Sequence, residues 1–96
     1  MNQYGQRAQT HWQRYLPSQF AKIADPEAFF EEMGSDLASQ IHDLADEIAG
    51  PDPRNETYMD KLGRLNRARL EAEHTVMAEA LPEPEADRQD SDEASR

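Results

Sequence analysis

The stretch "ADPEAFFEEMGSDLASQIHDLADEIAGPDP", residues 24–53, decides the fold of this chain because it holds a complete helix with both of its ends. Asp25 is a good N-cap, and Pro26 suits the first helical position, where no amide hydrogen is needed. Gly50 is typical of the residue after a helix, and the prolines that follow it cannot continue one. The stretch therefore predicts a helix over residues 26–49.

The apolar residues of this helix form a regular seam. Their spacing alternates between four and three residues, which is the pattern of a helix packed along a neighbour. The seam consists of Phe30, Gly34, Leu37, Ile41, Leu44 and Ile48. Gly34 costs about 1 kcal/mol of helix propensity. We interpret Gly34 as the point where another helix crosses closely and a bulky ring of that neighbour fits over the missing side chain.

A second long helix follows the connection "GPDPRNE". Asn55 or Thr57 can cap it, and Pro82 and Pro84 end it, so we predict a helix over residues 56–80. Arg69 falls near the centre of its apolar stripe. That stripe comprises Tyr58, Leu62, Leu65, Ala72 and Val76. A connection this short normally leaves two helices as antiparallel neighbours, which predicts a long helical hairpin.

Charge is segregated along the chain, whose net charge is −10. Residues 25–60 are strongly acidic, whereas a basic block begins at Lys61. In an antiparallel hairpin this block comes near the acids at the end of the first helix. The predicted charge pairs join Lys61, Arg64 and Arg67 to Asp43, Asp46 and Glu47. Exposed pairs contribute only about 0–1 kcal/mol each, so these would set register more than stability.

The two ends of the chain complete the expected architecture. The first residues predict a helix over about 3–15, broken by Pro17 and followed by a short further turn. Residues 82–96 are mostly charge and proline, which is typical of a disordered acidic tail. We predict an all-α, three-helix domain over residues 1–81, built on a long antiparallel hairpin with helices at about 3–15, 26–49 and 56–80.

Composition excludes several classes of protein. The chain has 96 residues, of which 36% are apolar, so a large core around a buried active site is not expected. It has no cysteine, which excludes disulfides and thiolate metal sites. Its first residues lack the apolar region of a secretory signal, and no apolar run is long enough to span a membrane. We expect a cytoplasmic protein without membrane contact.

The histidines do not assemble a known site. Glu71 and His74 have the spacing of one ligand pair of a di-iron bundle, but such a site needs two pairs and further glutamates. Only a dimer could supply the second pair, and a dimeric metal-binding protein therefore stays an alternative. His42 with Asp46 is better interpreted as a surface interaction, and His11 as a stacking or hydrogen-bonding residue. We predict no metal, no cofactor and no enzymatic activity.

Two features bear on nucleic acid. The N-terminal segment contains three aromatic residues, Tyr4, Trp12 and Tyr15, and three basic residues, Arg7, Arg14 and Lys22. This pattern could suggest base stacking, but the net charge argues against direct nucleic-acid binding, and a covering helix is the simpler interpretation. The acids of the first long helix could instead mimic a row of phosphates. The row would comprise Glu31, Glu32, Asp36, Asp43, Asp46 and Glu47.

The stretches "HWQRYLPSQFAKIADPEAFFEEMG" and "YMDKLGRLNRARLEAE" resemble small uncharacterised helical proteins of phages, plasmids and other mobile elements of actinobacteria. The resemblance implies a role in mobile-element biology and supplies no functional residues. We expect a non-enzymatic protein–protein interaction module, an adaptor or assembly accessory, that binds a protein partner or a second copy of itself through the seam. The alternative is an acidic DNA mimic or host-system inhibitor that binds a basic nucleic-acid-binding protein.

Overall fold

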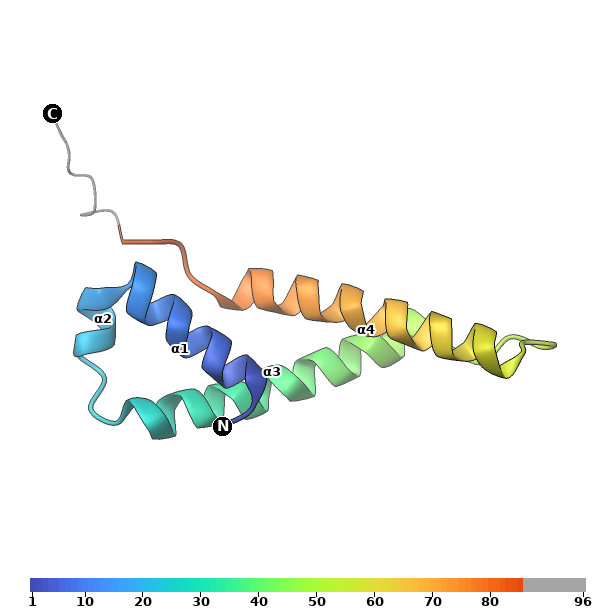
Figure 1. Cartoon of the computed structure of the whole chain (residues 1–96), viewed down its shortest axis with the longest axis horizontal. Helices are drawn as coiled ribbons and strands as arrows, with labels where there is room; N and C mark the ends of the chain where they lie inside the picture. The colour runs from blue at the N-terminus through green and yellow to red at the C-terminus, as the bar shows by residue number, and fades with distance from the viewer. Residues whose placement is uncertain (86–96) are drawn as a thin grey trace, which may run out of the picture. The chain divides into compact units, whose positions relative to one another are not determined.

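The computed structural model describes residues 1–85, where every regular element is a helix (Figure 1). The helices are α1 (Gln3–Tyr15), α2 (Pro17–Ala21), α3 (Pro26–Ala49) and α4 (Tyr58–Ala80). The predicted all-α class is confirmed, and so are the bounds of α1 and α3. Helix α4 begins at Tyr58 rather than at residue 56, and α2 is the short turn expected after Pro17. The predicted disordered tail is wrong for residues 82–85, because hydrogen bonds hold them to α1 and α2. The rest of the predicted tail, residues 86–96, lies outside the described residues.

The chain folds as two compact units, which are described one at a time. Unit 1 contains Met1–Ser35 together with residues 81–85 of the described chain. Unit 2 contains Asp36–Ala80. Helix α3 contributes its first part to unit 1 and its remainder to unit 2, whereas α1 and α2 belong to unit 1 and α4 to unit 2.

The helices begin where the capping residues place them. The Oδ1 atom of Asp25 accepts a hydrogen bond from the amide of Ala28 at 3.2 Å, which confirms the predicted cap of α3. For α4, the Oγ1 atom of Thr57 accepts from the amide of Asp60 at 3.0 Å. Thr57 is therefore the cap, and Asn55 instead takes a left-handed backbone conformation in the loop, with a φ of 69°.

Unit 1 has an aromatic core centred on Phe30, whose side chain is fully buried. The rings of Trp12 and Phe29 meet it edge-on, with centroids 5.8 and 4.9 Å away, and the ring of Phe20 stacks on it at 6.1 Å. Leu16, between α1 and α2, is 1% exposed. These rings come from three helices, so they hold α1, α2 and the start of α3 together.

Helix α1 crosses α3 backbone to backbone at Gly5 and Gly34. A Cβ atom added to Gly34 would lie 2.8 Å from the amide nitrogen of Gly5 and 2.9 Å from its Cα atom. Asn2 fixes the crossing, because its Nδ2 atom donates to the Gly34 carbonyl at 2.9 Å while its Oδ1 atom caps α1 through the Gly5 amide. The predicted close crossing is confirmed. The predicted ring over Gly34 is wrong, since the Asn2 side chain and the Gly5 backbone take that place.

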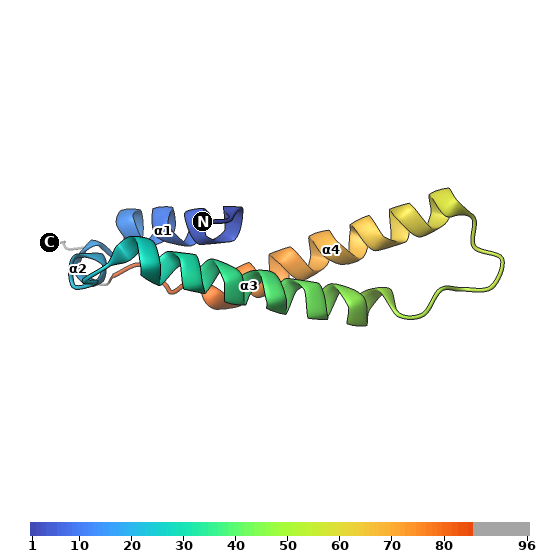
Figure 2. The same cartoon turned by 90° about the horizontal axis from the view of Figure 1, so that it is seen from below.

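Unit 2 is the predicted antiparallel hairpin of α3 and α4 (Figure 2). Helix α3 buries Leu37 and Ile41 here, whereas half of the residues that α4 buries are alanines. The buried residues of α4 are Ala68, Ala72, Val76 and Met77. Small side chains in this position let two helix backbones approach closely, because little volume lies between them.

The half of α4 nearest the loop departs from the predicted stripe. Tyr58 is 74% exposed, and Leu62 and Leu65 are 38% and 39% exposed. Arg64, one position before Leu65, is instead turned towards the end of α3, where it donates to the Ala49 carbonyl. Consecutive residues point about 100° apart on a helix, so this orientation moves Leu65 to the edge of the hairpin.

Candidate interaction surface of the helical hairpin

Arg64 organises the loop between α3 and α4. Its Nε and Nη2 atoms donate to both carboxylate oxygens of Glu56 at 2.7 and 2.9 Å, a two-pronged pairing that suits the planar guanidinium. Nη2 also donates to Asp52 at 2.7 Å, and Nη1 donates to the Ala49 carbonyl at 2.6 Å. Lys61 adds a second contact to Asp52 at 2.8 Å. We call Asp52, Glu56, Lys61 and Arg64 the Arg64 cluster.

The cluster also satisfies the C-terminus of α3. The last carbonyls of a helix lack partners within the helix and carry partial negative charge, so a guanidinium placed there is stabilising. Gly50 follows with a φ of 64°, as predicted for the residue after α3. Hydrogen bonds from Lys61 and Arg64 lower the pKa of Asp52, and hydrogen bonding to Glu56 raises the pKa of Arg64 above its ordinary value.

The predicted charge pairs are wrong for Lys61 and Arg64. Both bases bind the loop acids, Asp52 and Glu56, rather than the acids of α3. Within residues 1–85, no ion pair joins Arg67 to the predicted acids Asp43, Asp46 and Glu47. The sequence separation explains this outcome, because loop carboxylates close to the start of α4 reach the bases first.

The acids of α3 consequently keep an exposed face. Asp36, Asp43, Asp46 and Glu47 are all exposed in unit 2, and Glu31 and Glu32 are exposed in unit 1. Two of these acids lie near His42, whose Nδ1 atom is 3.6 Å from Asp43 and 3.7 Å from Asp46. The predicted surface interaction of His42 with Asp46 is therefore confirmed.

An apolar surface remains open at the loop end of unit 2. It consists of Ile48 from α3 and of Tyr58, Leu62 and Leu65 from α4, and we call it the open tip. All four side chains are at least 38% exposed. An apolar patch with a charged border is typical of a protein interaction site.

The predicted seam divides into a covered and an uncovered part. Phe30, Gly34, Leu37 and Ile41 are buried, and they form the internal core of the two units. Leu44 is half-buried, and Ile48 is 38% exposed. A partner could therefore reach only the end of the seam. The periodicity of α3 identified core residues but could not separate internal from external contacts, since both give the same spacing.

The other candidate residues do not converge. Glu71 and His74 are both exposed on α4, and within residues 1–85 no three His, Asp or Glu side chains are arranged to hold a metal ion. Two of the N-terminal aromatic residues considered for base stacking, Tyr4 and Trp12, pack within unit 1. Tyr4 is 5% exposed, and the Trp12 ring packs on Phe29 and Phe30.

Two further findings concern the whole of the described chain. Over residues 1–85, no helix has the length and apolar character needed to cross a membrane. Comparison with models of protein families, with curated proteins and with solved structures finds no match for this chain.

Proposed function

We propose that this protein is a non-enzymatic interaction module of the cytoplasm, an adaptor or assembly accessory of a mobile element, and that it binds a protein partner through the open tip. The observation that carries the proposal is the exposure of Ile48, Leu62 and Leu65 on adjoining helices of one hairpin. Burying an apolar side chain of this size is worth about 1.5–3 kcal/mol, so an uncovered group of them favours association.

The chemistry of the tip defines the partner. Apolar side chains on two adjoining helices suit an amphipathic helix, which can pack its own apolar face against them. The acids Asp43, Asp46 and Glu47 are exposed on α3, so basic residues beside that apolar face would fit. A second copy of this chain is one such partner, because α4 carries Arg67 on its exposed surface.

The test uses a photo-crosslinking residue in place of Leu62, with the same residue at position 70 as the control. Leu70 is 65% exposed and lies away from the open tip on the helical wheel. We expect one defined crosslinked product from position 62 in the native host and little from position 70, and we expect Leu65→Gln to abolish it. Equal crosslinking from both positions would show non-specific contact and would refute the proposal.

A second function, mimicry of nucleic acid, is favoured by the exposed acids of α3. The sequence predicted that Lys61, Arg64 and Arg67 would neutralise part of this row, yet Lys61 and Arg64 bind Asp52 and Glu56. The negative electrostatic potential along α3 is therefore neutralised less than the sequence predicted. A basic nucleic-acid-binding protein is the kind of partner that this potential would attract.

A salt series on the crosslinked partner distinguishes the two functions. Affinity that is nearly constant between low and physiological salt supports binding through the open tip. A loss of about a hundred-fold or more, together with full binding by Leu65→Gln, supports mimicry. Asp43→Asn with Asp46→Asn should then weaken binding, whereas the same pair of substitutions should matter little for an apolar contact.

A further inference from the structure

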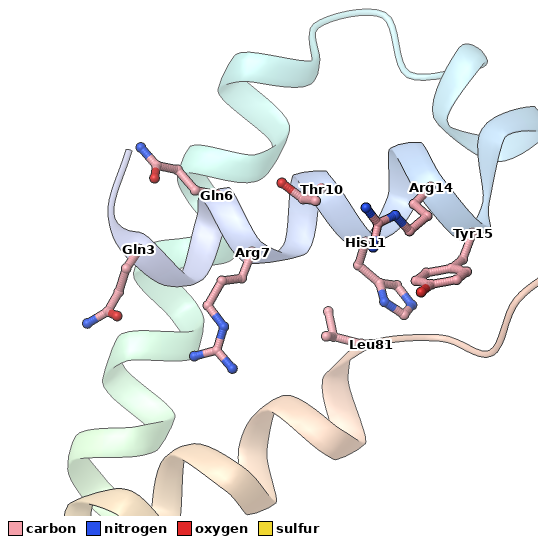
Figure 3. A pocket seen from close by; sticks show the side chains of 8 residues that line it. All are labelled: Gln3, Gln6, Arg7, Thr10, His11, Arg14, Tyr15 and Leu81. Carbon is pink, nitrogen blue, oxygen red and sulfur yellow. The ribbon is translucent and has the colours of Figure 1, made fainter.

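Unit 1 contains an open hollow of about 600 Å³ along one side of α1 (Figure 3). Arg7, His11 and Tyr15 project from α1 towards the side on which Leu81 lies. Leu81 borders the hollow, and the residues that follow it are hydrogen-bonded to α1 and to the start of α2. Its volume lies within the range of small-molecule sites, about 300–1,000 Å³.

Three hydrogen bonds hold residues 81–85 in place. The Nε2 atom of His11 donates to the Pro82 carbonyl at 2.7 Å, and the amide of Glu85 donates to the Tyr15 carbonyl at 2.9 Å. The carboxylate of Glu85 accepts from the amide of Gln19 at 3.0 Å. This carboxylate is therefore engaged at the start of α2.

The hollow is basic although the chain is acidic. Arg7 and Arg14 line it, and the residues of the described chain that line it include no Asp or Glu. Within residues 1–85, neither arginine forms an ion pair with an acid, and Arg14 only lies over the Tyr15 ring at 5.9 Å. Two guanidinium groups without counter-charges in one hollow favour an anionic occupant.

The spacing of the two arginines restricts that occupant. Residues seven positions apart lie on the same face of a helix, and their Cα atoms are about 10 Å apart along the helix axis. Guanidinium groups bind phosphate and carboxylate oxygens in a two-pronged manner. We propose that this hollow binds a small organic molecule with two oxyanion groups, phosphates or carboxylates, about 10 Å apart, one held by Arg7 and the other by Arg14. The site is separate from the open tip, so each proposal can fail alone.

The test compares fructose 1,6-bisphosphate with fructose 6-phosphate by calorimetry and by amide NMR shifts. We expect the bisphosphate to bind about ten-fold more tightly, because a second charged contact is worth about that factor. The shifts should concentrate on α1. Arg7→Gln and Arg14→Gln should each reduce the affinity for the bisphosphate to that for the monophosphate. Suberate, a dicarboxylate of similar length, distinguishes carboxylate from phosphate recognition.

Arg67→Gln is the matched control, since Arg67 is an exposed arginine of unit 2, outside the hollow. It should leave the affinity unchanged, and circular dichroism should show that all three variants fold. Equal affinity for the two sugar phosphates, equal weakening by Arg67→Gln, or no binding of bisphosphate and suberate at millimolar concentration would overturn the proposal. Tighter binding of a single-stranded oligonucleotide than of the bisphosphate would overturn it too.

Discussion

The two units bring helices together by opposite means. Unit 1 places one large ring, Phe30, at the centre of a ring cluster and brings two backbones into contact at Gly5 and Gly34. Unit 2 buries two alanines of α4 together with Val76 and Met77, and it leaves Leu62 and Leu65 at its edge. The comparison teaches that the size of an apolar residue does not decide its burial here. In α4, Leu65 lies at the edge because the neighbouring Arg64 is turned towards the Ala49 carbonyl.

The largest expected effect comes from truncating the central side chain of unit 1. Phe30→Ala should lower the free energy of unfolding by about 3–5 kcal/mol, because a fully buried ring is lost and a cavity remains. Leu65→Ala in unit 2 should cost less than about 1 kcal/mol, since that side chain is already 39% exposed. Urea unfolding measures both, and Phe30→Leu provides a folded variant if Phe30→Ala does not fold. Equal losses would remove the distinction between the units.

The second prediction applies one substitution to a glycine of each unit. Gly34→Ala should destabilise by about 1–3 kcal/mol, because the new Cβ atom would press on the backbone of Gly5. Gly63→Ala should stabilise by about 0.5–1 kcal/mol, because its nearest neighbour, Arg67 Nη1, would lie at an ordinary 3.4 Å. Thermal melts show whether each substitution raises or lowers the melting temperature. A stable Gly34→Ala protein would show that the crossing is looser than described.

The third prediction concerns the Arg64 cluster. Arg64→Gln should speed amide hydrogen exchange in residues 49–57, because the C-terminus of α3 and the loop acids lose their common partner. Arg64→Lys should restore only part of the protection, since an ammonium cannot pair with both oxygens of Glu56 in the same way. Arg67→Gln, which changes charge equally, should leave the loop unaffected. Similar exchange in the two glutamine variants would contradict the assignment.

The smallest effect should appear on acidification of unit 2. The pKa of Asp52 lies below its ordinary value of 3.8 through hydrogen bonds from Lys61 and Arg64. Its contribution to stability is therefore complete above about pH 4 and disappears as the pH falls through the lowered pKa. Asp52→Asn should melt slightly lower than the native chain at pH 7, and the difference between the two melting temperatures should shrink as the pH is lowered below about 4. A difference that does not shrink on acidification would rule out this origin.

Local chemistry determined the helices. Asp25, Thr57 and Gly50 act through atoms within a few residues of themselves, so their positions in the sequence were sufficient to place the ends of α3 and to allow Thr57 as the cap of α4. The alternating apolar spacing of α3 likewise identified the buried residues Leu37 and Ile41. A helix cap and a helical period both arise within one element, which explains why they can be read without a neighbour.

Only the tertiary structure decided how the helices face one another. The rotation of α4 follows from the reach of Arg64 to Glu56 and to the end of α3, and charge patterning in the sequence allowed other partners equally well. The hollow along α1 was missed for the same reason. The absence of acids over residues 1–24 was visible in the sequence. The placement of Leu81 at the hollow, however, depends on hydrogen bonds of His11 and Tyr15 to residues about 70 positions away. Contacts of that range depend on the summed packing of several elements, so no local pattern in the sequence specifies them.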